Sequence, residues 1–170
     1  MTILDTLSPL RNRSGNVRSP GLDDATVLRL SDQFPDLNIA AHRAADALPA
    51  LIAEFAELID ADEQAQIEAA QSGFINFYPD DAISPYVAIA ACGPWIITSK
   101  GRVLHDSGGY GMLGFGHTPD AVIDAIAKPQ VMANIMSPSF SQLRVAKALR
   151  AEIGHTRGTC PYSKFLTLNS

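Results

Sequence analysis

Residues 95–105 read WIITSKGRVLH and carry the clearest β-hairpin pattern of the chain. The two ends of this stretch, Trp95–Thr98 and Arg102–His105, are short apolar runs of the kind that favours β-strands. The residues between them, Ser99-Lys100-Gly101, place a glycine last, as in a common three-residue hairpin connection. The stretch therefore predicts a β-hairpin, and Tyr86–Ala91 is a further strand candidate before it.

Upstream of the hairpin, the apolar residues follow helical spacing. Over residues 37–59 they fall on one face of a helix, and Pro49 either starts a new helix or kinks this one. Asp60 or Asp62 is a suitable N-cap for a second helix. Residues 74–85 contain two prolines and two adjacent aspartates, and they predict a loop.

Downstream of the hairpin, a cluster of glycines precedes two predicted helices. In Thr118-Pro119-Asp120, the threonine is a good N-cap, the proline fits the first helical position and the aspartate suits the positive end of the helix dipole. Pro129 stops this helix. A second helix is predicted over Ser141–Ile153 with Gly154 at its C-terminal end, and Lys164–Leu168 predicts a short strand.

The composition is that of a globular protein, with 46% hydrophobic and 18% charged residues. A net charge of −5 and the lack of a long basic run disfavour nucleic-acid binding. No apolar run approaches the roughly 18 residues of a membrane span. Cys92 and Cys160 form no CxxC pair and are expected to be reduced thiols of a cytoplasmic protein. Residues 1–20 contain three arginines and no apolar signal core, so we expect an exposed, partly ordered lead-in.

Several motifs have ordinary structural explanations. Residues 109–114 fit G-x-G-x-x-G, but the next helix begins too late for a dinucleotide-binding loop, whose third glycine lies in the first helical turn. Such a loop instead requires positive φ angles or close backbone approach. His117 is expected to be a structural hydrogen-bonding residue, and Asp106 a turn residue that binds nearby amides. The four histidines make no metal-ligand spacing.

Three motifs follow one another in a particular order: Gly93-Pro94-Trp95-Ile96, Gly101-Arg102-Val103-Leu104-His105-Asp106 and Gly116-His117-Thr118-Pro119. In this order and spacing they resemble the class III aminotransferases, which depend on pyridoxal 5'-phosphate (PLP). In that family, a hairpin reading roughly G-x-Y-[LI]-x-D-x-x-G-[KR]-x-Y-[LI]-D is followed by a small-residue loop and then by G-H-x-x-P. The resemblance covers about half of the chain, residues 86–170. Thr98 and Leu104 depart from the family's aspartate and tyrosine, which bears on the subfamily more than on the fold.

The resemblance implies that PLP is the cofactor. The family needs a Schiff-base lysine and an aspartate on the pyridine nitrogen, which lie further along the chain than Ser170, and a phosphate loop. Ser170 matches the first residue of that loop and is the cofactor contact that carries over. No lysine stands in a matching context, and all are expected to be solvated surface residues: Lys100, Lys128, Lys147 and Lys164. The catalytic lysine is therefore expected outside these 170 residues, which alone are expected to be inactive.

The resemblance also implies three substrate-binding aromatic residues. Tyr110 occupies the loop before G-H-x-x-P, which lines the active site in the family. Phe140 matches a stretch that reaches the active-site region at a dimer interface, and Tyr78 matches an N-terminal aromatic that faces substrate. The alternative for each is packing in a core or an interface.

The predicted fold class is α/β, with the PLP-transferase fold of the aspartate aminotransferase type. The expected organisation is a helical extension over 1–77, the N-terminal part of a small domain over 78–140 and the start of a large PLP-binding domain over 141–170. The expected function is amino transfer from an amine or ω-amino acid to a 2-oxo acid by a cytoplasmic homodimer. The alternatives are an aminomutase, racemase or decarboxylase of the same fold, or a non-catalytic binding domain.

Overall fold

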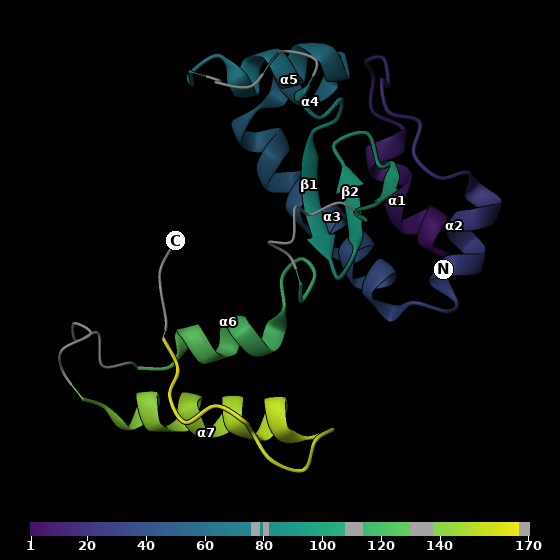
Figure 1. The fold of residues 1–170 in the computed structure, drawn as a ribbon. Coiled ribbons are helices and arrows are strands. Elements are labelled where there is room, and N and C mark those ends of the chain that lie inside the picture. The colour runs from purple at the N-terminus through teal and green to yellow at the C-terminus, as the bar shows by residue number, and fades with distance from the viewer. Residues whose placement is uncertain (76–78, 80–81, 108–113, 130–137, 167–170) are drawn as a thin grey trace. The chain divides into compact units, whose positions relative to one another are not determined.

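The computed structural model describes residues 1–75, 79, 82–107, 114–129 and 138–166, and it combines helices with a small sheet (Figure 1). The chain forms two compact units, Met1–Ile123 and Asp124–Ser170. The combination of helices and strands agrees with the predicted α/β class in general. The more specific PLP-transferase fold and the three predicted domain ranges stay predictions.

The N-terminal residues fold into a helix, so the prediction of an exposed lead-in over residues 1–20 is wrong. Helix α1 (Ile3–Arg11) begins with a capping box, in which the backbone amide of Asp5 donates to Thr2 Oγ1 at 3.3 Å and the Thr2 amide donates to Asp5 Oδ2 at 2.7 Å. Its apolar stripe includes Leu7 and Leu10, both fully buried. Helix α2 (Asp24–Ser31) follows, with the Asp23 carboxylate accepting from the Thr26 amide.

The longest helix, α3 (Pro35–Glu54), continues through Pro49. Of the two possibilities at this proline, a new helix is therefore not observed, and the break comes at Phe55. Helix α3 packs against α1 and against two strands of the sheet, as Figure 1 shows. Its buried face consists mainly of small residues, which allow close approach to the sheet: Leu37, Ala40, Ala41, Ala44 and Leu48.

Two short helices complete this side of the first unit, α4 (Ala56–Asp60) and α5 (Glu63–Gln71). Asp62 occupies the N-cap position of α5, as predicted, but its side chain makes no capping bond. Its carboxylate accepts instead from the Asn16 backbone amide at 2.7 Å and from Asn16 Nδ2 at 3.1 Å. Hydrogen bonds from the Asn16 backbone and side chain lower the pKa of Asp62 below its usual value.

The sheet has three antiparallel strands in the order β1 (Ala88–Cys92), β2 (Trp95–Thr98) and β3 (Val103–His105). The predicted β2–β3 hairpin is confirmed. The Thr98 amide donates to Arg102 O at 3.0 Å, and this bond closes the three-residue turn. Gly101 in that turn has a φ of +64°, and a Cβ there would lie 2.8 Å from Arg11 Cγ.

The core of the first unit joins the N-terminal helices to the hairpin. Leu7 and Leu10 of α1, Val27 of α2, and Ile97 and Val103 of β2 and β3 are all fully buried. Each such side chain contributes roughly 1.5–3 kcal/mol on burial, so residues far apart in sequence stabilise one another.

The second unit contains α7 (Phe140–Gly154) and a segment that returns along it. Helix α6 (Asp120–Ala127) lies at the boundary between the units. The sequence analysis missed the capping box of α7, in which Ser139 and Gln142 bind each other's backbone amides. Residues 164–166 form no strand, so the predicted strand is wrong over this part, and residues 167–168 lie outside the described residues. Arg150 holds the returning segment by donating to Ser163 O at 2.6 Å and by stacking 5.4 Å from the Phe165 ring centre.

Candidate functional site

The candidate site is the base of the glycine-rich loop, here called the loop base, which consists of Gly93, Pro94, Asp106 and His117. Gly93 and Pro94 form the two-residue turn between β1 and β2. Asp106 follows β3, and His117 precedes α6. The chain between Asp106 and His117 therefore begins and ends at the same turn.

Backbone hydrogen bonds fix both ends of this loop. The Gly93 amide donates to His117 O at 3.1 Å, and the His117 amide donates to Gly93 O at 2.7 Å. The Asp106 amide donates to Pro94 O at 2.7 Å. A closed base removes much of the conformational freedom of a loop whose ends would otherwise move independently.

A side-chain pair joins the two ends directly. His117 Nε2 lies 3.0 Å from Asp106 Oδ2, and their side chains are 24% and 21% exposed. One nitrogen of a neutral imidazole can donate to the carboxylate, and a protonated ring makes the contact an ion pair. The prediction that His117 is a structural hydrogen-bonding residue is confirmed by this contact. The Asp106 carboxylate binds a residue on the other side of the loop, and its predicted bonds to nearby amides stay a prediction.

The loop base requires two glycines. Gly93 has a φ of +53° and Gly116 a φ of +75°, a region that disfavours a Cβ. A Cβ on Gly116 would lie 2.7 Å from Gly93 Cα, and a Cβ on Gly93 would lie 2.6 Å from Asp36 Oδ2. Any side chain at Gly116 therefore collides with backbone, which has no flexible end to move aside.

Thr118 joins the loop base to the edge of the sheet, and its predicted N-cap role is wrong. Its φ is +52°, whereas an N-cap residue is usually extended, and its hydroxyl donates to Ala91 O at 3.2 Å. Helix α6 begins at Asp120, one residue later than predicted. Arg43 of α3 reaches the same place, with NH1 3.4 Å from Ala91 O and NH2 3.3 Å from Asp120 Oδ1. Thr118 therefore binds the sheet at Ala91 O and does not serve as the N-cap of α6.

Only one of the four predicted site residues lies within the described residues. Tyr110, Tyr78 and Ser170 lie outside them. Phe140 is the first residue of α7, directly after the Ser139 cap, and its side chain is 80% exposed. The exposed ring is not a core residue of the second unit, so packing inside that unit does not explain it.

Lys100 is a residue that the sequence analysis misjudged. It is 2% exposed, and the prediction of a solvated surface lysine is wrong for it. Its ammonium donates to Ser14 O at 2.6 Å, Ala61 O at 2.6 Å and Ile59 O at 3.3 Å. Burial lowers the pKa of Lys100 below its usual value, although nearby carboxylates raise it. The acceptors come from distant segments, so no local pattern in the sequence announces this site.

The described lysines do not fit the Schiff-base role of a PLP site. Lys100 would have to leave three carbonyl acceptors to react. The other three are exposed, as predicted: Lys128, Lys147 and Lys164. Among the described residues no group of three or more histidine, cysteine or acidic side chains is placed to hold a metal ion.

Comparisons with known proteins leave the site to be interpreted from this chain alone. No protein-family model, no curated protein and no solved structure matches the chain. In the part of the chain that the structure describes, no helix is long and apolar enough to cross a membrane. Cys92 and Cys160 are both free thiols, and burial raises the pKa of Cys92.

Proposed function

We propose that this chain is the N-terminal part of a class III PLP-dependent aminotransferase, which transfers an amino group from an amine or ω-amino acid to a 2-oxo acid. The proposal depends on the order and spacing of the motifs in residues 86–170. The loop base is the observation that supports it best, because the three motifs that carry the resemblance meet there as one structure.

In the proposed enzyme, PLP supplies the carbanion chemistry when bound. The residues of this chain bind the substrate and the cofactor phosphate, and they orient the substrate. The loop base holds the two ends of the loop that contains Tyr110, and orientation of a substrate against a fixed wall is a large part of enzymatic rate enhancement. We propose Tyr110, Phe140 and Tyr78 as substrate-binding residues and Ser170 as a contact of the cofactor phosphate. Free backbone amides at a helix N-terminus bind such an anion.

The proposed enzyme is a homodimer, as the resemblance implies, and we place it in the cytoplasm. The exposed ring of Phe140 agrees with a residue that a partner subunit or the rest of the same subunit covers. The free thiols agree with a reducing compartment.

A half-reaction assay on the protein encoded by the complete reading frame tests the proposal. The protein is loaded with PLP, and a panel of diamines and ω-amino acids is added without and then with 2-oxoglutarate or pyruvate. We expect the visible absorbance of the cofactor to change with an amine and to return with a 2-oxo acid. Turnover of the amine without a 2-oxo acid would instead indicate an aminomutase, racemase or decarboxylase. If the complete protein bound no PLP, the alternative of a non-catalytic binding domain would be favoured.

Replacement of Tyr110 tests the substrate wall in the same protein. Tyr110→Ala should raise KM for the amine or slow the first half-reaction, at unchanged PLP absorbance, by the equivalent of about 1–3 kcal/mol, because an aromatic wall is lost. Tyr162→Ala is the matched control, since Tyr162 is 57% exposed in the second unit. Unchanged kinetics together with a lower melting temperature would make Tyr110 a packing residue.

A further inference from the structure

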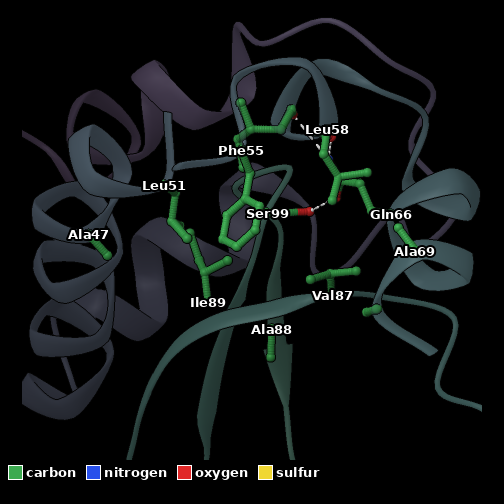
Figure 2. A pocket seen from close by; sticks show the side chains of 12 residues that line it. Ala47, Leu51, Phe55, Leu58, Gln66, Ala69, Val87, Ala88, Ile89 and Ser99 are labelled. Atoms are coloured by element: carbon green, nitrogen blue, oxygen red, sulfur yellow. Dashed lines mark hydrogen bonds between the residues drawn. The ribbon is translucent and has the colours of Figure 1, made fainter. Parts of the chain in front are cut away.

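A cavity of about 420 Å³ lies in the first unit, between the helices and the edge of the sheet (Figure 2). It is bounded by the C-terminal half of α3, by α4 and α5, and by the start of β1. Its lining residues are Ala47, Leu51, Phe55, Leu58, Ile59, Gln66, Ala69, Ala70, Val87, Ala88, Ile89 and Ser99. Its size falls within the range of roughly 300–1,000 Å³ that is typical of small-molecule sites.

The walls of the cavity are apolar. Figure 2 shows the side chains of Leu51, Phe55 and Ile89 directed toward the space from three different segments. Phe55 is 43% exposed, although its ring faces other apolar side chains. An apolar molecule in the cavity would remove this ring from water, which favours binding.

Among the described residues that line the cavity, Gln66 and Ser99 are the only ones with polar side chains, and both already act as donors. The Ser99 hydroxyl donates to Gln66 Oε1 at 2.5 Å. The Gln66 amide nitrogen donates to Leu58 O at 2.9 Å and to Ile59 O at 3.0 Å. What remains on the two side chains is acceptor capacity, in the lone pairs of Ser99 Oγ and Gln66 Oε1.

This pair is also rigid. Gln66 is 4% exposed and Ser99 1% exposed, and their hydrogen bonds join α5 to α4 and to the β2–β3 turn (Figure 2). The acceptors are therefore held in place before any ligand arrives, which lowers the entropic cost of binding.

We propose that this cavity is a binding site for a small molecule with an apolar body and one hydrogen-bond-donating head, a hydroxyl or an N–H group. The body lies against Leu51, Phe55 and Ile89, and the head donates to the Ser99–Gln66 pair. An anionic head such as a carboxylate meets no free side-chain donor among the described lining residues and loses its hydration without compensation. The site goes beyond the proposed amino transfer and does not depend on it.

Isothermal titration calorimetry of the full chain with n-octanol and with octanoate tests the head-group preference. The two probes share an alkyl chain and differ in the head. We expect n-octanol to bind and octanoate to bind about tenfold or more weakly, which corresponds to about 1.4 kcal/mol. Equal binding of the two probes, or binding of neither, would overturn the proposal.

Variants that fill the cavity locate the site. Ala47→Leu and Ala69→Leu extend the wall from α3 and from α5. Each should weaken n-octanol binding about tenfold or more with little change in melting temperature, since the added atoms enter empty space. The control is Ala50→Leu, on an exposed position of α3 that is not part of the lining. If a filling variant kept its melting temperature and bound n-octanol as the unchanged protein does, the site would lie elsewhere.

Discussion

At the scale of single residues, Lys100 shows how a charged side chain joins distant segments. Its ammonium binds carbonyls of the N-terminal segment, of α4 and of the junction between α4 and α5. Glu63 acts in the same region, since its Oε2 accepts from the amides of Arg18 at 2.6 Å and Ser19 at 2.9 Å. A buried charge is tolerated only when it is hydrogen-bonded or paired, and these contacts satisfy the Lys100 ammonium and Glu63 Oε2, whereas Glu63 Oε1 is buried without a hydrogen-bond partner.

The lowered pKa of Lys100 predicts how stability changes with pH. Between the folded pKa and the usual value of 10.5, the unfolded chain binds more protons at this lysine than the folded chain. The contribution of Lys100 to the free energy of unfolding should therefore rise as pH rises through this window. The measurement is urea unfolding of the wild type and of Lys100→Met across the alkaline range, with Lys147→Met in exposed α7 as control. If the difference in the free energy of unfolding between the wild type and Lys100→Met shrank with rising pH, the pKa of Lys100 in the folded chain would be raised instead.

Gly116 tests the geometry of the loop base. Gly116→Ala forces a Cβ to within 2.7 Å of Gly93 Cα at a positive φ, so we expect a loss of at least about 1–2 kcal/mol in the free energy of unfolding. Gly114→Ala is a close control, because a Cβ there meets nothing within 4 Å. Equal stability of the two variants by urea unfolding would contradict the close approach of Gly116 to the β1–β2 turn.

At the scale of elements, α1 anchors the first unit. Leu7→Ala removes a fully buried side chain between α1 and the rest of the core. The expected loss is about 2–5 kcal/mol in the free energy of unfolding, since a cavity remains. Leu28→Ala in α2, where the leucine is 37% exposed, should lose much less. If thermal unfolding placed the two variants at the same stability, the N-terminal residues would be the loose lead-in that their arginines suggested.

Local patterns predicted the elements that depend on local chemistry. The β2–β3 hairpin, the start of α5 at Asp62 and most of α7 follow from turn residues, caps and apolar spacing. Helix α1 was not predicted, although Thr2 and Asp5 form a capping box at its start. The predicted strand at residues 164–168 matched a strand of the resembled family, and residues 164–166 have no strand partner within the described residues.

The candidate site depends on tertiary contacts that spacing does not contain. The glycine motif over residues 109–114 predicted positive φ angles or close backbone approach, and Gly114, its one glycine within the described residues, has neither. The positive φ angles lie instead at Gly93 and Gly116, outside that motif. The meeting of His117 with Gly93 and Asp106 required the chain to return to the β1–β2 turn. The role of Lys100 likewise depends on carbonyls from distant segments. Thr118 donates to a sheet carbonyl, a contact that its position in the sequence does not indicate.

At the scale of the whole molecule, the two units differ in how well they bury their apolar residues. The first unit has a continuous core of buried side chains from α1, α2, α3 and the sheet. In the second unit the exposed fractions are 80% for Phe140, 63% for Leu143 and 83% for Leu166. Large exposed apolar patches commonly mark interaction sites. The proposed function assigns these side chains to contacts with the rest of a subunit and its dimer partner.

Peptide mapping of PLP trapped by borohydride tests whether the complete protein is a PLP enzyme whose Schiff-base lysine lies outside this segment. The protein encoded by the complete reading frame is incubated with PLP, reduced, digested and analysed by mass spectrometry. We expect one PLP for each chain, attached to a lysine encoded after Ser170, with none on the lysines of this segment: Lys100, Lys128, Lys147 and Lys164. A complete protein without a specific adduct would contradict the proposed PLP-dependent function. An adduct on one of these four lysines would contradict the proposed location of the Schiff-base lysine.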